Sequence, residues 1–242
     1  MAGYISVPFF PSLNGKELSY IMDYGDVDAL FIGKIETWDD IKNDLPSEMP
    51  IIRFPKYEGC SNVTKGHEWH EFINSHEPIE NPHKPKLSDL WTIIFTSGTT
   101  GNPKGVMLTY QAIDGIKVVL DDPNNPLGIK HTGNNDFISY LPLNHIFERV
   151  VIEWCSFRYG GTISFVESIE TFGQNLKEVQ PHVFAAAPRV WTKLQMGILS
   201  KFPQKKLDTL LKIPLLSTIL KKLIRKGLGF SRVRVTVSGS AP

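Results

Sequence analysis

Thr96-Ser97-Gly98-Thr99-Thr100-Gly101-Asn102-Pro103-Lys104-Gly105 is the most informative stretch of this chain. It follows an apolar run at 90–95, rich in aromatic and β-branched residues, which predicts a buried strand. The residues after it, 106–120, carry a helical pattern. A strand, a loop rich in glycine and hydroxyl residues, and a helix, in this order, are typical of a phosphate-binding site.

The side chains of this loop suit a polyphosphate ligand. Gly98, Gly101 and Gly105 can adopt positive φ and let the backbone come close to a ligand. Backbone N–H groups in such a loop form an anion site, and we expect the N-terminus of the following helix to reinforce it. Lys104 supplies a cation. The hydroxyl groups that can bond to phosphate oxygens are those of Thr96, Ser97, Thr99 and Thr100.

The loop differs from a Walker A loop, whose pattern is G-x-x-x-x-G-K-S/T. Here Gly98 and Gly101 are three residues apart, and Gly105 follows the lysine where Ser or Thr should stand. The alternative without a ligand is a flexible surface loop with a solvated lysine. The coincidence of strand context, hydroxyl density and lysine favours a phosphate-binding loop.

These ten residues resemble the signature loop of the adenylate-forming superfamily, Y/F-T-S-G-T-T-G-x-P-K-G, which includes acyl-CoA synthetases, luciferases and peptide-synthetase adenylation domains. The resemblance implies that the loop holds the β- and γ-phosphates of ATP and moves during turnover. It also implies a catalytic role for Lys104 and places Thr99 near the Mg²⁺ that ATP carries. The nucleotide-binding residues implied in the loop are Thr96, Ser97, Gly98, Thr99, Thr100, Gly101 and Lys104.

A second element resembles the same superfamily. Residues 136–143 predict a strand and its exit turn, and 142–148 match the family pattern P-L-x-H-x-F-E. The match implies that His145 and Phe147 line the acyl pocket. A neutral His145 would act there as a catalytic group that donates a hydrogen bond to the carboxylate or acyl phosphate. The alternative is that His145 caps a helix running from about 146 to 158.

Two further segments resemble the same superfamily, and the first of them points to its long-chain fatty-acid branch. Residues 188–193 are similar to P-R-V/I-W/F/Y-x-K, a segment common in long-chain acyl-CoA synthetases, although Trp191 itself is expected in the core. Residues 238–242, Ser-Gly-Ser-Ala-Pro, resemble a family turn that passes close to adenine and the acyl carbonyl. This match implies that Gly239, Ser240 and Ala241 bind the nucleotide.

The implied reaction is the activation of a fatty acid by MgATP to an acyl-adenylate, followed by transfer of the acyl group to coenzyme A. The family's Y-G-x-T-E motif and C-terminal lysine do not occur in this sequence. We therefore expect an internal piece of a longer enzyme, without the C-terminal lid domain, that alone binds nucleotide weakly and does not turn over. Three alternatives stay open: a non-catalytic or degenerate nucleotide-binding module, adenylation of a different carboxylic acid, and a peripheral membrane-anchoring protein.

Composition sets the broad class. The 242 residues are 41% hydrophobic and 21% charged with a net charge of +1, which gives no electrostatic case for nucleic acid. Cys60 and Cys155 have no C-x-x-C spacing, so we expect a reducing, cytoplasmic compartment. No apolar run approaches the roughly 18 residues of a transmembrane helix, and the N-terminus lacks the basic region of a signal peptide.

The expected fold class is α/β, with parallel sheets flanked by helices, as in the truncated large N-terminal domain of an adenylate-forming enzyme. Residues of about 1–89 would form part of a first subdomain and a connector, and about 90–242 the phosphate loop with the acyl- and nucleotide-binding subdomain. We expect a buried strand at 2–10, a helix from about 15 to 23 capped by Asn14 or Ser12, short strands near 29–33 and 51–54, and a surface loop at 121–135.

The histidines at 67–76 suggest a metal site only at first sight. His67 and His70 are three residues apart, whereas the zincin motif requires a spacing of four. We expect instead an amphipathic helix with Trp69 and Phe72 inward and the histidines outward.

Residues 201–226 are strongly basic, and Asp208 is their single acid. Pro214 should divide them into two helices, and apolar residues recur at helical spacing within 216–226. Contact with an anionic membrane surface, packing on the chain's own domain and docking on a missing part of the protein are all compatible with this pattern.

Overall fold

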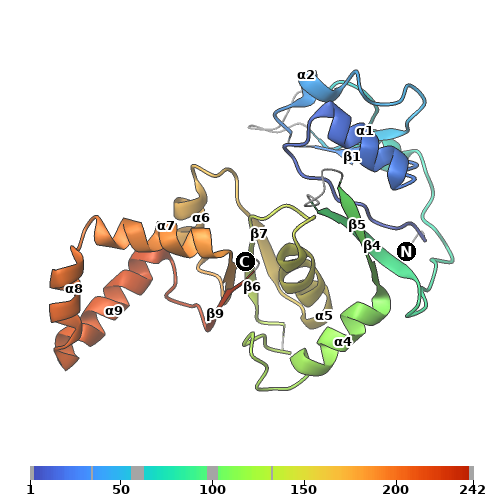
Figure 1. Cartoon of the computed structure of the whole chain (residues 1–242). Coiled ribbons are helices and arrows are strands. Elements are labelled where there is room, and N and C mark those ends of the chain that lie inside the picture. The colour runs from blue at the N-terminus through green and yellow to red at the C-terminus, as the bar shows by residue number, and fades with distance from the viewer. Residues whose placement is uncertain (1–2, 34, 56–62, 97–102, 132, 240–242) are drawn as a thin grey trace. The chain divides into compact units, whose positions relative to one another are not determined.

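In a computed structural model, residues 3–33, 35–55, 63–96, 103–131 and 133–239 are described (Figure 1). The chain divides into two compact units. Unit 1 comprises 1–115 and 142–146, and unit 2 comprises 116–141 and 147–242. The strand at 90–96 pairs on both sides with residues of unit 1, namely Ser6 and 104–109.

The first sheet of unit 1 is parallel, in the order β1-β2-β3. Its helix α1 begins where predicted, because the Asn14 side chain accepts a hydrogen bond from the Glu17 N–H at 3.0 Å and Glu17 reaches back to the Asn14 N–H. The elements are α1 (Gly15–Tyr24), β1 (Leu30–Ile32), α2 (Trp38–Ile41), β2 (Ile51–Arg53), β3 (His67–Glu68) and α3 (Trp69–Asn74).

The histidines near β3 behave as ordinary polar residues. In α3, Trp69 and Phe72 are partly buried and His70 is exposed, as predicted, whereas His67 belongs to β3 rather than to the helix. No group of three His, Cys, Asp or Glu side chains that could hold a metal ion occurs among the described residues.

A second sheet in unit 1 is an antiparallel pair, β4 (Leu90–Thr96) with β5 (Lys104–Thr109). Residues 106–109 were predicted as helix, and this is wrong. They belong to β5, where their cross-strand partners run from Ile94 for Val106 to Leu90 for Thr109. Helix α4 (Tyr110–Leu120) begins only after β5.

The expected buried strand at 2–10 is also wrong for the described residues 3–10. A single parallel bridge joins Ser6 to Thr92, supported by a 2.8 Å hydrogen bond from the Thr92 hydroxyl to the Ser6 carbonyl. The side chains of Tyr4, Ile5 and Phe10 are exposed. Phe9, by contrast, is partly buried and packs against the core cluster of unit 1, so the apolar side chains of this segment are divided between an exposed and a partly buried set.

Unit 2 alternates parallel strand pairs with helices, which is the predicted α/β arrangement. β6 (Asp136–Ser139) pairs with β7 (Thr162–Phe165), and β8 (Val183–Ala186) pairs with β9 (Val235–Ser238). Its helices are the π-helical segment η1 (Glu148–Trp154), α5 (Cys155–Tyr159), α6 (Phe172–Val179), α7 (Pro188–Leu199), α8 (Gln204–Leu211) and α9 (Pro214–Leu228). No helix in the described ranges has both the length and the apolarity needed to cross a membrane.

Trp191 is partly buried and packs against a core cluster of unit 2, in line with the expected core position. Its ring packs edge-on to Phe184 at 5.2 Å, and its Nε1–H donates to the Ala186 carbonyl at 3.2 Å. Cys155 is fully buried in a neighbouring cluster, and burial raises the pKa of its thiol to about 12, so this cysteine is chemically inert at neutral pH.

The surface loop predicted at 121–135 is more ordered than its composition indicated. The buried side chain of Asn125 exchanges hydrogen bonds with the backbone of Ile129. The buried side chain of Asn135 bonds in the same way to Lys130 and donates to the Gly160 carbonyl at 3.1 Å. These two amides replace the regular backbone ladder that the segment lacks.

Candidate functional site

The glycine- and hydroxyl-rich loop connects the two strands of a hairpin. Thr96 and Lys104 form the last cross-strand pair before it, and the Thr96 hydroxyl donates to the Lys104 carbonyl at 3.4 Å. Both side chains are exposed at this end of the hairpin. Ser97, Gly98, Thr99, Thr100 and Gly101 lie outside the described residues.

The expected contribution of a helix N-terminus to this loop is wrong. α4 begins at Tyr110, whose N–H donates to the Asp89 carbonyl at 3.1 Å at the opposite end of the hairpin. The six residues of β5 separate the helix from the loop by about 20 Å at roughly 3.3 Å per residue. Any anion site here therefore depends on the loop's own N–H groups, its hydroxyls and Lys104.

Gly105, which closes the signature stretch, is required by packing. A Cβ at this position would lie 2.9 Å from the Ile93 Cγ2 and 3.2 Å from the Phe95 ring. The glycine thus lets β5 approach the apolar side chains of β4 closely.

His145 lies in a short turn, 142–146, that belongs to unit 1 together with Thr96 and Lys104. The turn is closed by a 2.8 Å hydrogen bond from the His145 N–H to the Pro142 carbonyl. Burial lowers the pKa of the half-buried imidazole from its ordinary value, which favours the neutral form of the ring. Because helical residues begin at Ile146, this position is compatible with both sequence predictions for His145, pocket and cap.

Asn144, beside His145, is a residue that sequence reasoning missed. Its side chain is only 5% exposed, yet neither Oδ1 nor Nδ2 has a hydrogen-bond partner among the described residues. Buried amides are normally satisfied, so an orphaned one next to His145 marks a place for a polar group. The family pattern gave no signal, because Asn144 occupies its variable position.

Glu148 is the second residue that was missed. It is 2% exposed at the first turn of η1, and its Oε2 accepts a hydrogen bond from the Leu141 N–H at 3.3 Å. Burial raises the pKa of this carboxyl to about 7, opposed by hydrogen bonds from the Ser139 side chain and the backbone at 140–141. Glu148 thus links the residues that follow β6 to the first turn of η1 by hydrogen bonds.

Within unit 2, the structure brings together two of the predicted site residues. A Cβ at Gly239 would lie 2.7 Å from the Phe147 ring, so the chain beyond β9 passes directly against this phenylalanine. Sequence separation between them is large, and only the matched patterns pointed to a shared site. Ser240 and Ala241 lie outside the described residues.

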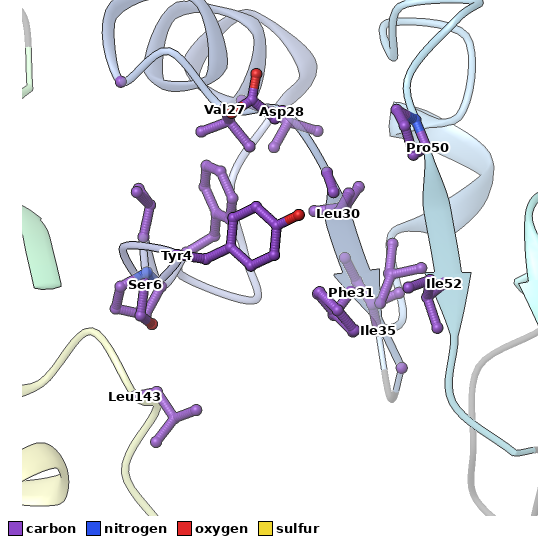
Figure 2. Close-up of a pocket in the computed structure, with 18 of the residues that line it drawn as sticks. Tyr4, Ser6, Val27, Asp28, Leu30, Phe31, Ile35, Pro50, Ile52 and Leu143 are labelled. Atoms are coloured by element: carbon purple, nitrogen blue, oxygen red, sulfur yellow. The ribbon is translucent and has the colours of Figure 1, made fainter. Parts of the chain in front are cut away.

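Unit 1 also contains an open cavity of about 1670 Å³. Figure 2 shows side chains of the N-terminal segment, such as Tyr4, facing those of β1 and β2, including Phe31 and Ile52. The lining is largely apolar, and none of the described residues that form it is Lys or Arg. This cavity is therefore unsuited to a polyphosphate, and the hairpin loop stays the candidate nucleotide site.

Comparisons with known proteins cover the whole chain. The model of a family described as AMP-binding enzyme matches residues 1–242. The chain is 30% identical over 277 residues to long chain acyl-CoA synthetase 5 of Arabidopsis thaliana, covering 99% of this chain and 40% of that protein. It is 29% identical over 272 residues to long-chain-fatty-acid–CoA ligase 1 of Homo sapiens, covering 98% of this chain and 38% of that protein. The chain thus spans about two fifths of the length of these relatives.

Solved structures agree on the fold. A red-emitting luciferase from Phrixothrix hirtus superposes with a TM-score of 0.66 at 16% identity, covering 99% of this chain and 42% of that one. The adenylation domain of a carboxylate reductase from Mycobacterium chelonae superposes with a TM-score of 0.69 at 19% identity, covering 98% of this chain and 39% of that one. The predicted α/β class with parallel sheets and flanking helices is confirmed, with the β4–β5 hairpin as an antiparallel addition.

Proposed function

Because this chain belongs to the AMP-binding enzyme family, we propose that its protein activates a long-chain fatty acid with ATP, first to an acyl-adenylate and then to acyl-CoA. The observation that carries the proposal is the signature loop held between paired Thr96 and Lys104, in a chain similar over nearly its full length to long-chain acyl-CoA synthetases.

In the first step, a carboxylate oxygen attacks the α-phosphorus of ATP, and the bond to the β-phosphate oxygen breaks to release pyrophosphate. In the second, the thiolate of coenzyme A attacks the acyl carbonyl, and AMP leaves. Negative charge develops on the pyrophosphate during the first step. In this proposal Lys104 and the loop hydroxyls stabilise that charge.

The other site residues have supporting roles in this proposal. His145, whose pKa is lowered by burial so that the neutral ring is favoured, donates a hydrogen bond to the reacting carboxylate. Phe147 and Gly239, which contact each other, border the acyl group and the nucleotide. Ser240 and Ala241 continue the nucleotide contact. Mg²⁺ would arrive with the phosphates of ATP, and the family resemblance puts Thr99 near it.

The partners that follow are a fatty acid, ATP and coenzyme A, with no role for nucleic acid. We place the protein in the cytoplasm, in contact with a membrane surface through 216–226.

Acid-dependent exchange of pyrophosphate into ATP tests the proposed function in the natural full-length protein. We expect exchange with a long-chain fatty acid and much less with a short-chain, an aryl or an amino acid. Exchange with one of the other acids alone would replace the proposed substrate. Nucleotide binding without exchange for any acid would identify a non-catalytic binding module.

A further inference from the structure

Helices α8 and α9 lie side by side and carry the most one-sided charge of the chain (Figure 1). Pro214 separates them as predicted, at the first position of α9, where proline is tolerated. Between 201 and 226 there are eight basic residues and one acid, Asp208, which accepts a hydrogen bond from Gln204 at 2.7 Å. The basic residues are Lys201, Lys205, Lys206, Lys212, Lys221, Lys222, Arg225 and Lys226.

The apolar residues of α9 form two stripes and not the single one that its sequence indicated. One stripe faces the protein, with Ser217 and Leu220 buried and Ile224 and Leu228 partly buried, at spacings of three and four. The other remains exposed. Leu216 is 41% exposed, Ile219 49% and Leu223 59%, again at helical spacing.

Lysines border the exposed stripe directly. Lys222 follows Ile219 by three positions and Lys226 follows Leu223 by three, so each pair lies side by side on the helix surface. Both lysines are exposed. Arg225 does not belong to this group, because its guanidinium donates to the carbonyls of Phe230 and Val233, at 2.7 Å for the latter.

We infer that the exposed stripe of α9 and its bordering lysines dock the protein on an anionic lipid bilayer. A helix of this kind lies in the interface plane, with its apolar side chains among the acyl chains and its lysines extended toward the phosphates. Charge complementarity selects this occupant, since the α8–α9 pair is almost purely cationic and the cytoplasmic face of a membrane is anionic. The inference does not depend on the catalytic function.

The test is flotation of the natural full-length protein with vesicles of phosphatidylcholine alone or with about 30% phosphatidylserine. We expect binding to the anionic vesicles that weakens with salt, and little binding to neutral ones. Two separate double variants, Ile219→Ser with Leu223→Ser and Lys222→Glu with Lys226→Glu, should each lower the partition coefficient by at least about tenfold.

Matched controls separate this stripe from other exposed positions. Ile169 is 81% exposed and lies outside α8 and α9, so Ile169→Ser should leave partition unchanged. The double variant Lys84→Glu with Lys86→Glu reverses two exposed lysines elsewhere and should behave like wild type. Circular dichroism and thermal melting verify that each variant is folded.

Two outcomes would overturn the inference. In one, both α9 variants bind anionic vesicles as well as wild type. In the other, wild type does not bind vesicles but sediments as a dimer, and the double variant Ile219→Ser with Leu223→Ser sediments as a monomer. The exposed stripe would then be an interface between two copies of the protein.

Discussion

Among single residues, the buried carboxyl of Glu148 has the most direct physical consequence. Its pKa is raised from 4.5 to about 7, mainly by burial, with Glu153 adding repulsion and Tyr140 nearby. The folded state therefore keeps a proton that the unfolded chain loses near pH 4.5. Between these values the unfolded state binds fewer protons, so stability must fall as pH rises.

This difference corresponds to roughly 3 kcal/mol at about 1.4 kcal/mol per pKa unit. Glutamine mimics the protonated acid, so Glu148→Gln should leave the free energy of unfolding nearly unchanged at about pH 5 and raise it at about pH 8. Urea denaturation at both pH values measures this. Glu80→Gln, at an exposed position, is the control. Equal pH dependence in Glu148→Gln and wild type would contradict the assignment.

On the scale of elements, the signature hairpin explains which local predictions failed. Val106, Met107 and Leu108 suit a strand as well as a helix, and periodicity alone cannot separate these possibilities over so short a run. The strand conformation of these residues is determined by pairing with β4 and by the close approach of the chains at Gly105. Both are tertiary interactions, which a local sequence pattern does not reveal. The cap at Asn14, by contrast, is purely local and was predictable.

The end of α9 offers a matched pair of glycines for a stability measurement. Gly229 ends the helix with φ of 79°, and a Cβ there would collide with the Leu176 carbonyl. Gly227 lies inside the helix, and a Cβ added there would meet no atom within 4 Å outside its own helix backbone. We expect Gly229→Ala to lower the free energy of unfolding by at least about 1–2 kcal/mol and Gly227→Ala to raise it by up to about 1 kcal/mol.

Thermal and urea unfolding of the two alanine variants give the comparison. Opposite signs would support the helix boundary at Gly229. If Gly229→Ala were as stable as Gly227→Ala, the left-handed cap would be wrong.

For the whole molecule, sequence predicted the alternation of parallel strands and helices because each element carries its own apolar pattern. It could not predict that the turn at 142–146 belongs to unit 1 while its flanks belong to unit 2, since this depends on contacts distant in sequence. The same holds for the site. Lys104 and His145 were recognisable by pattern, whereas Asn144 and Glu148 become notable only through burial and hydrogen bonding.

We propose that Lys104, at the loop end of the signature hairpin, acts on the phosphates of ATP. The most direct test is fatty-acid-dependent pyrophosphate exchange by wild type, Lys104→Ala and the exposed-site control Lys84→Ala in the natural full-length protein. Because Lys104→Ala removes charge stabilisation from the transition state, we expect its exchange rate to fall at least about 100-fold while its melting temperature stays unchanged. The exchange rate of Lys84→Ala should equal that of wild type. Full exchange activity in folded Lys104→Ala would contradict this role of Lys104.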